Sequence, residues 1–238
     1  SSQQRSADLG SQRWAPLPGT ATEGAAIAQI TGGRLLSGEQ ARAATIQQQL
    51  QAPRLLHLAT HAYFQPDLPE ADRNNDPQQQ RSNGTSQGPA ALSGENPLLR
   101  SGIALAGANQ PDADPGDDGY LTALEVARLN WKGTELVVVS ACDSGKGDIQ
   151  VGEGVYGLKR AIAVAGARSS LLSLWKVDDR ATAAFMESFY RKLKAGMGRA
   201  DALAATQKEF RQSSNPTWRH PYAWAAFQLS GDWGPVRW

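Results

Sequence analysis

The feature that most constrains this fold is an aliphatic run that ends in small residues and glycines. Leu136–Val139 is a stretch of consecutive aliphatic residues, mostly β-branched, which predicts a strand buried on both faces. The chain then passes Ser140 and reaches Cys142, its only cysteine. Open α/β sheets build their sites at the carboxyl ends of buried strands, so this position favours a functional thiol.

The ordinary interpretation of a free cysteine is a small buried core residue. An intrachain disulfide is excluded because Cys142 has no second cysteine to pair with, and a cysteine-rich metal cage is implausible. Glycines and small polar residues fill the chain from Cys142 until a helical pattern begins at Val155. A core position would not need so much backbone freedom directly after it, so the pattern favours a site.

Apolar runs alternate with helical patterns along most of the chain. Strands alternating with helices indicate one α/β domain with a mostly parallel central sheet and helices on both faces. Besides 136–139, strands are predicted at 33–36, 55–59, 103–106, 169–175 and 222–229, and helices at 23–30, 37–50, 122–129, 154–165, 178–194 and 199–211.

Two segments stand outside this alternation. Residues 1–13 are polar and are expected to form a flexible leader before a single domain at 14–238. Residues 65–96 are dominated by Pro, Gln, Asn, Ser and Gly, which predicts a long loop insertion and no separate domain. The chain starts at Ser1 without an initiator methionine, so we expect it to be part of a longer protein.

Composition narrows the classes of partner. The 238 residues carry a formal net charge of +1, so no electrostatic argument favours a nucleic acid. No apolar run approaches the roughly 20 residues that span a bilayer, and no signal peptide is visible. A single unpaired cysteine suits a reducing compartment. We therefore expect a cytoplasmic protein with neither a nucleic-acid nor a membrane partner.

His61 is the first candidate partner of Cys142. It lies just beyond the predicted strand 55–59, so both residues would share one carboxyl edge if the two strands are neighbours. Cysteine nucleophiles use a histidine for proton transfer, and backbone N–H groups near Ala62 and Cys142 could hold an oxyanion. Spacing alone is equally consistent with two unrelated structural residues.

Two histidines four residues apart could also bind a metal. Few other ligand candidates surround His57 and His61, and His57 lies inside an apolar run. A hydrogen-bonded core histidine is the favoured interpretation of His57.

Two further patterns imitate binding motifs. Residues 152–157 form a G-x-G-x-x-G with Asp178 about twenty residues later, yet the fingerprint does not follow its strand directly, and close helix–sheet packing explains the glycines better. Residues 114–119 with Glu125 echo a calcium loop, but Pro115 and Gly116 occupy early places and the leading helix is missing. A solvated acidic loop is the favoured interpretation there.

Ordered blocks of sequence cover nearly the whole chain from Trp14 onward. They are HLATHAYF (57–64), NPLLRSGIALAGAN (96–109), DGYLTALEVARLNWKGTELVVVSACDSG (118–145), GEGVYGLKRAIAVAGARSSLLSLWKVDD (152–179) and HPYAWAAFQLSGD (220–232). Together these blocks resemble the CHAT domain, a family of caspase-like domains that is related to the separases and usually attached to tetratricopeptide repeats.

The resemblance implies a caspase-like three-layer α/β sandwich and a cysteine endopeptidase. Its His–Cys dyad would be His61 and Cys142, and the N–H groups of Ala62 and Cys142 would hold the oxyanion. Many relatives have glycine where this chain has Ala62. The alanine keeps the backbone N–H donor but narrows the space at the oxyanion site. The resemblance also implies a protein or peptide substrate, an upstream repeat domain in the same full-length protein, and neither a cofactor nor a metal.

The resemblance also suggests how the substrate is held. Ser140 stands where metacaspases have the aspartate with which they select arginine or lysine. Residues 174–179 resemble an acidic segment of separases, in which Lys176 takes the place of the first aspartate. Asp178 could instead cap the helix that follows it, and we expect that role more strongly. Cleavage after medium-sized or basic residues is expected. The substrate-binding candidates are Ser140, Asp143, Asp178 and Asp179.

A second function class stays open at this point. A catalytically silent module could keep the caspase-like fold and use its surface as an interaction scaffold. Retention of both His61 and Cys142 argues against this alternative.

Overall fold

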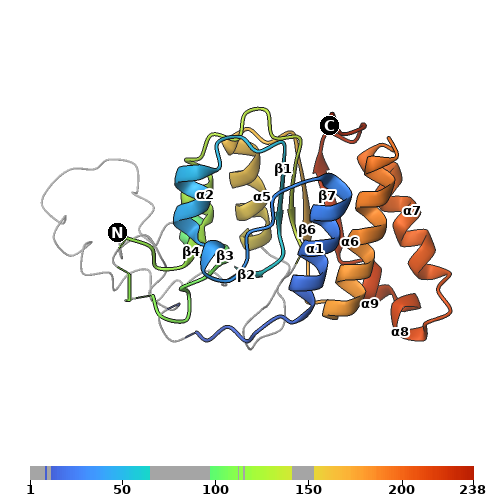
Figure 1. Cartoon of the computed structure of the whole chain (residues 1–238), viewed down its shortest axis with the longest axis horizontal. Coiled ribbons are helices and arrows are strands. Elements are labelled where there is room, and N and C mark those ends of the chain that lie inside the picture. Colours follow the sequence, from blue (N-terminus) through green and yellow to red (C-terminus); the bar gives the residue numbers. More distant parts are fainter. Residues whose placement is uncertain (1–8, 10–11, 65–96, 112, 115, 141–152) are drawn as a thin grey trace, which may run out of the picture.

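The computed structural model describes residues 9, 12–64, 97–111, 113–114, 116–140 and 153–238 (Figure 1). Cys142, Asp143 and the predicted loop insertion at 65–96 therefore lie outside the described residues.

The central sheet has the strand order β1-β5-β6-β7, with β1 (Leu55–Leu58), β5 (Leu136–Val139), β6 (Ser169–Ser173) and β7 (Phe227–Gly231). β1, β5 and β6 pair in parallel, and β7 is antiparallel to β6. The prediction of a mostly parallel central sheet is confirmed.

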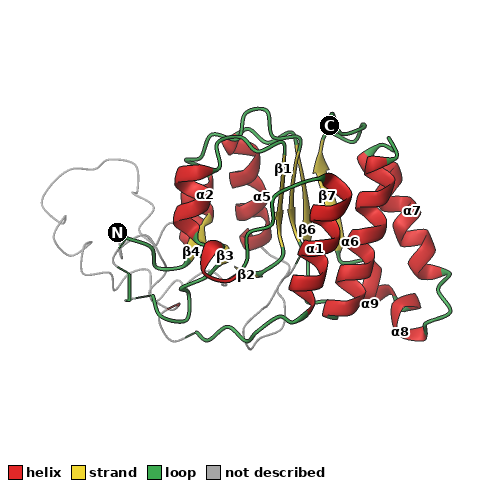
Figure 2. Ribbon diagram, viewed as in Figure 1, coloured by secondary structure: helices red, strands yellow, loops and turns green. Residues whose placement is uncertain are grey.

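Helices cover both faces of this sheet and make it the middle of three layers (Figure 2). Side chains alternate along β5, so Val137 and Val139 face one apolar cluster while Leu136 and Val138 face the other. One outer layer contains α2 (Ala43–Gln49), α4 (Ala123–Val126) and α5 (Glu153–Ala165), and the other contains α1 (Gly19–Thr31), α6 (Asp179–Lys194) and α7 (Arg199–Arg211).

A second, antiparallel sheet lies beside the first and was not foreseen. Its order is β2 (His61–Phe64), β3 (Ser101–Ala104) and β4 (Tyr120–Thr122). The strand predicted at 103–106 thus belongs to this small sheet, and His61 begins a strand of its own after β1 ends. Single-sequence reasoning missed it because His61–Phe64 is too short and mixed to show a clear alternation.

Several predicted boundaries were wrong. Residues 33–36 form no strand, since Gly32 ends α1 in a left-handed conformation and no neighbouring strand pairs with the segment that follows. The helix predicted at 37–50 is divided into η2 (Gly38–Gln40) and α2, because the side chain of Asp117 binds the backbone N–H of Ala44 and starts a new helix there.

The last predicted strand also begins differently. Residues 216–219 and 221–224 form two short helices, α8 (Pro216–Arg219) and α9 (Pro221–Trp224), before β7 starts. Each has proline at its first position, where a missing N–H costs nothing, and Asn215 and His220 cap them. A third short helix, η4 (Pro97–Leu99), precedes β3. Among the described residues, no helix is both long and apolar enough to cross a bilayer.

Other predicted elements agree with the structure. The bounds of α7 match the prediction, and α5 starts one residue early. Thr122 caps α4 in a reciprocal capping box with Glu125, although the helix ends at Val126 and not at Leu129. Burial raises the pKa of the Glu125 carboxyl, against the hydrogen bonds from Thr122.

A buried ion pair joins the start of β5 to α7 and the C-terminal segment. The Arg199 side chain is fully buried, and its Nη2 donates to Glu135 Oε2 at 2.6 Å while its Nη1 donates to the Gly234 carbonyl at 2.7 Å. Arg168 lies 3.5 Å from the same glutamate. The Gly234 N–H, and then these arginines, hold the pKa of Asp232 below its usual value.

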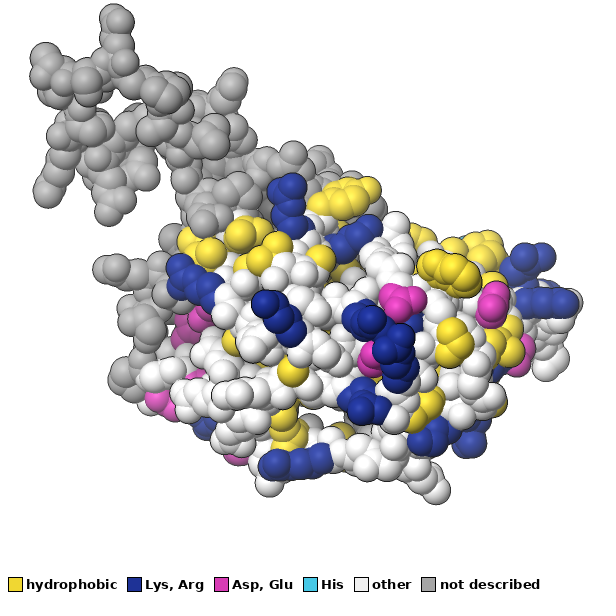
Figure 3. All heavy atoms as spheres, turned by 90° about the horizontal axis from the view of Figure 1, so that it is seen from above, with side chains coloured by type: hydrophobic (Ala, Val, Ile, Leu, Met, Phe, Trp, Pro, Cys, Tyr) yellow, Lys and Arg dark blue, Asp and Glu magenta, His cyan; other side chains and the backbone are white. Residues whose placement is uncertain are grey.

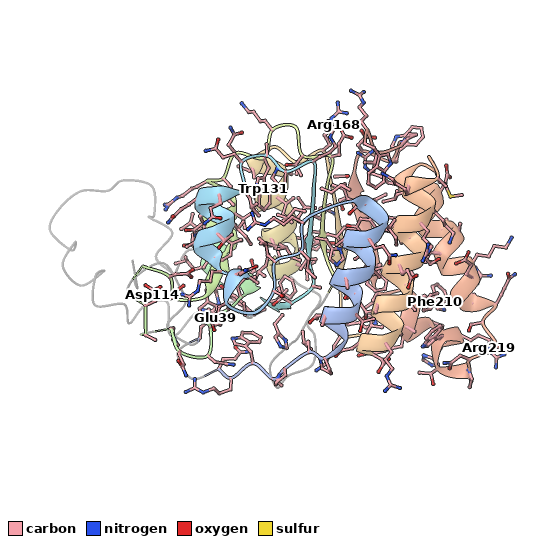
Figure 4. The ribbon with its side chains drawn as sticks, in the orientation of Figure 1. Glu39, Asp114, Trp131, Arg168, Phe210 and Arg219 are labelled. Carbon is pink, nitrogen blue, oxygen red and sulfur yellow. The ribbon has the colours of Figure 1, made fainter. Side chains whose placement is uncertain are left out.

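This pair lies at the amino ends of the parallel strands. Arg168, directly before β6, marks that end in Figure 4. From above, the same end carries Lys and Arg side chains with some Asp and Glu among them (Figure 3). The carboxyl edge of the sheet, where the candidate residues lie, is at the opposite end.

We expect Arg199→Met to destabilise the domain by about 3–5 kcal/mol, because it leaves the buried Glu135 carboxylate without its closest ion-pair partner. Urea unfolding followed by circular dichroism measures the loss. Arg191→Met removes the exposed pair with Glu187 and is the matched control, with an expected change below about 0.5 kcal/mol. Equal effects of the two variants would contradict a special role for the buried pair.

Candidate functional site

β1 and β5 are neighbours in the central sheet. Leu58 pairs in register with Val139, and the Ser140 N–H donates to the Leu58 carbonyl at 3.2 Å. The chain therefore leaves both strands at one carboxyl edge, towards His61 in one case and towards Cys142 in the other. The condition on which the sequence argument depended, that these two strands are adjacent, is confirmed.

A tight connection fixes the position of His61. The Thr60 hydroxyl donates to the Ala104 carbonyl at 2.6 Å, and His61 pairs with Ala104 as the first residue of β2. The histidine is only 6% exposed. Its ring is therefore held by a strand and a packed environment, as a proton-transfer group requires.

The histidine ring is oriented by the N-terminal segment. His61 Nε2 lies 2.7 Å from the Ala15 carbonyl oxygen, and the ring packs against Trp14 with centroids 5.1 Å apart. A carbonyl oxygen only accepts, so Nε2 carries the proton in this hydrogen bond. The neutral tautomer that satisfies it has its lone pair on Nδ1.

The segment that carries Ala15 is clamped from both sides. The Trp14 N–H donates to Asn109 Oδ1 at 2.8 Å, and Asn109 Nδ2 donates to the Trp14 carbonyl at 3.0 Å. Trp14 Nε1 donates to the Tyr120 hydroxyl at 3.0 Å. We call residues 14–18 the strap.

Sequence reasoning missed the role of the strap in orienting His61. The available signal was Pro16, because the residue before a proline is kept out of the helical region, and Ala15 is therefore held extended. Leu9, inside the expected leader, is fully buried and belongs to an aromatic cluster with Trp14, Tyr63 and Tyr120. At that residue the leader is packed on the domain.

His57 has a different setting from His61. Its Nε2 lies 2.9 Å from Glu23 Oε1 and its Nδ1 lies 3.2 Å from the Tyr190 hydroxyl. Burial, and then the charge of Glu23, raise the pKa of Tyr190, so the hydroxyl keeps its proton. The interpretation of His57 as a hydrogen-bonded core histidine is confirmed, and within the described part of the chain no three His, Cys, Asp or Glu side chains gather to hold a metal.

The acidic loop is used for local structure. Asp117 binds the N–H groups of Ala44 and Gly119, and Glu125 is held in the capping box of α4. Arg42 bridges Asp114 at 3.1 Å and Glu39 at 2.7 Å. Figure 4 labels both acidic residues. A calcium loop that starts at Asp114 would need Asp114, Asp118 and Glu125 as ligands, and all three make local bonds, since Asp118 accepts from the Tyr120 N–H at 3.0 Å.

Gly157 is the one glycine of the motif at 152–157 whose surroundings the structure describes. Its contacts agree with a role in close helix–sheet packing. A Cβ on Gly157 would meet Ser101 Oγ of β3 at 2.9 Å, which is tighter than real Cβ contacts. Helix α5 therefore approaches the small sheet closely at this point, as the favoured interpretation required.

The predicted substrate-binding residues are distributed around the carboxyl edge. Ser140 is buried directly after β5, and its Oγ has no hydrogen-bond partner among the described residues. The Asp178 carboxylate accepts from Arg180 N and Ala181 N, both at 3.1 Å, so the expected helix cap is confirmed. Asp179 accepts from the Gly19 N–H at 3.4 Å, where α1 and α6 begin side by side.

Ala62 packs its side chain on the face of β2 opposite to His61. It is fully buried in the cluster that also contains Ile103 and Leu121, whereas His61 faces Trp14. Lys176, on the connection between β6 and α6, is exposed. The roles predicted for these residues stay predictions, since they depend on the segment that contains Cys142.

Comparisons with known proteins give one family model and two similar curated proteins. The family model described as "CHAT domain" matches residues 1–232. "Tetratricopeptide repeat protein 28" of Homo sapiens is 27% identical over 218 residues, which cover 92% of this chain and 8% of that protein. The protein of the same name from Mus musculus is 26% identical over 92% of this chain and 9% of its own length. The chain thus spans less than a tenth of these curated relatives.

We expect Asn109→Ala to loosen the strap, because the change removes two hydrogen bonds of about 1 kcal/mol each to Trp14. Amide hydrogen exchange at Trp14 should become faster, and long-range proton–nitrogen NMR spectra should show the His61 ring losing its single Nε2-protonated tautomer. Asn130→Ala, at an exposed turn, is the control. Unchanged exchange and an unchanged tautomer in Asn109→Ala would show that the strap does not depend on Asn109.

Proposed function

The chain belongs to the CHAT domain family, and from that premise we propose that it is a cysteine endopeptidase domain that cleaves protein or peptide substrates. The observation that carries the proposal is His61, which is held by the Ala15 carbonyl at the sheet edge that leads to Cys142. A buried histidine whose ring is fixed by a hydrogen bond suits proton transfer to and from a nearby thiol.

In the proposed reaction, His61 Nδ1 takes the proton of the Cys142 thiol, and the thiolate attacks the scissile carbonyl carbon. The C–N bond then breaks, the amine leaves with the proton from His61, and an acyl-enzyme remains. A water molecule, deprotonated by the same histidine, attacks the thioester and releases the carboxylic acid and the thiol. The Ala15 carbonyl supports the imidazolium that forms in between, because Nε2–H points at it.

The oxyanion would be held by the N–H groups of Ala62 and Cys142. Ala62 is the residue after the histidine and is anchored by a fully buried side chain. Preorganised backbone donors of this kind stabilise developing charge without having to rearrange during the reaction.

We propose that the substrate residue before the scissile bond binds in a subsite near Ser140 and Asp143. Asp178 and Asp179 would lie at the margin of this subsite. Ser140 is small and uncharged, so it supplies no carboxylate that would select a basic side chain. Asp178 is engaged as a helix cap and Asp179 with Gly19, so any basic preference they support is weaker than that of a dedicated aspartate. We therefore propose cleavage after medium-sized or basic residues.

The broader setting follows from the relatives. Their names refer to tetratricopeptide repeats, and we propose that this domain is attached to such a repeat domain in its full-length protein. We also propose that it acts in the reducing cytoplasm, where Cys142 stays a thiol. The second candidate is a catalytically silent interaction module, which is consistent with the repeat-protein names. Labelling of the single cysteine distinguishes the two.

We expect a peptidyl acyloxymethyl ketone to alkylate Cys142, as measured by intact mass, and Cys142→Ala to abolish both labelling and peptide cleavage. His61→Ala should lower kcat/KM by ~10²–10⁴-fold, since general acid–base assistance is lost. His220→Ala, an exposed helix cap, is the matched histidine control and should retain activity. Cleavage that survives in Cys142→Ala would refute the mechanism, and an unlabelled cysteine in the folded wild type would favour the scaffold.

Profiling with a peptide library should give cleavage after medium-sized or basic residues. Asp179→Asn should reduce kcat/KM for arginine relative to leucine at that position, because it removes a carboxylate proposed to lie at the margin of this subsite. Asp178→Ala should instead lower the stability of α6 by about 1 kcal/mol, because it removes an N-cap. Strict cleavage after aspartate or glutamate would contradict the assignment and implicate Lys176 or Arg100.

A further inference from the structure

β7 is the last strand of the central sheet, and its outer edge has no partner strand among the described residues. Two hydrogen bonds show which backbone groups of β7 point towards β6: the Leu174 N–H donates to the Ala226 carbonyl, and the Asp232 N–H donates to the Arg168 carbonyl. Because inward and outward positions alternate in an antiparallel pair, Phe227 and Leu229 direct their N–H and C=O groups away from β6.

This outer edge lies in a groove of about 550 Å³ between β7 and α7. All residues of β7 line the groove on one side. On the other side, Ala200, Leu203, Ala204 and Gln207 lie on one face of α7, with the spacing of successive helical turns. Because Ala200 and Ala204 have small side chains, α7 leaves space in the groove opposite β7.

Bonds at both ends hold α7 antiparallel to β7. The Ala200 N–H donates to the Trp233 carbonyl at 3.2 Å, just beyond the end of the strand. At the other end, Gln207 Nε2 donates to the Trp224 carbonyl at 3.4 Å, just before the strand begins. The groove therefore has a fixed width and follows the strand along its length.

The chemistry of the groove selects its occupant. Every lining residue is uncharged, although charged residues make up 20% of the chain. Trp233, 73% exposed, supplies an apolar platform at the far end of β7. A charged segment would lose water here without gaining an ionic partner, whereas an uncharged one loses little.

A second copy of this chain does not fit the groove. An isologous contact needs a self-complementary surface, and here the strand edge lies in a concavity beside α7. Two such concavities facing each other would keep their strand edges apart. A single extended segment has no flanking helix and can reach the edge.

We propose that this groove binds an extended, uncharged segment of a partner protein, which adds a strand to β7. The segment forms backbone hydrogen bonds with Phe227 and Leu229, and every second side chain, small or aliphatic, rests on Ala200 and Ala204. The site is separate from the proposed dyad and does not depend on peptidase activity.

A random decapeptide display library, selected on the chain after Cys142 has been blocked with iodoacetamide, tests the proposal. Selected peptides should be uncharged and carry small or aliphatic residues at alternate positions. Ala204→Glu, which places a carboxylate in the groove, should weaken their binding at least about tenfold. Ala205→Glu changes the next residue of α7, outside the groove, and should not. Equal binding by both variants, or a selection that yields no peptide, would contradict the proposed binding site.

A second measurement does not depend on how well the variants fold. N-methylation of one peptide bond at a time should weaken binding about tenfold at every second position and little at the others, because only alternate N–H groups of an added strand reach β7. Amide exchange at Phe227 and Leu229 should slow when the peptide binds. A scan with no two-residue period, or a peptide that a Cys142-directed ketone displaces from the unblocked chain, would refute strand addition on β7.

Discussion

The structure depends on the complete burial of β5. Its residues are fully buried because β1 and β6 pair with its two edges and helices cover both of its faces. Burial of a side chain of this size contributes about 1.5–3 kcal/mol, and an aliphatic strand has no polar side chain to leave unsatisfied. Because β1 and β5 are parallel neighbours, both end at the same edge of the sheet. The two candidate dyad residues follow these two strand ends in the chain.

Some of this could be predicted from sequence and some could not. The strand 136–139 and the helices α5 and α7 follow local rules, because periodicity and caps are written within a few residues. The small sheet, the division at η2 and the strap follow from distant partners, such as Asp117 for Ala44 and Asn109 for Trp14. Pro16 indicates that Ala15 is extended, but a single sequence does not identify these distant partners, so the orientation of His61 was not foreseeable.

The two histidines show how the fold separates structure from chemistry. His57 lies within a strand, and both of its ring nitrogens face protein partners, one of them the carboxylate of Glu23. His61 follows the strand, and its Nε2 faces the uncharged carbonyl of Ala15. A neutral acceptor orients an imidazole without adding a negative charge beside the proposed thiolate.

The strap has a mechanical consequence. It holds His61 at Ala15 and continues directly into α1, whose first residue, Gly19, lies so close to Asp179 of α6 that a Cβ there would collide with that side chain. The strap is thus a short tether fixed at two points, by Asn109 and Tyr120 at Trp14 and by Asp179 at Gly19. Because Ala15 lies between these two anchor points, the position of the hydrogen-bond acceptor of His61 is set jointly by the small sheet and by α6.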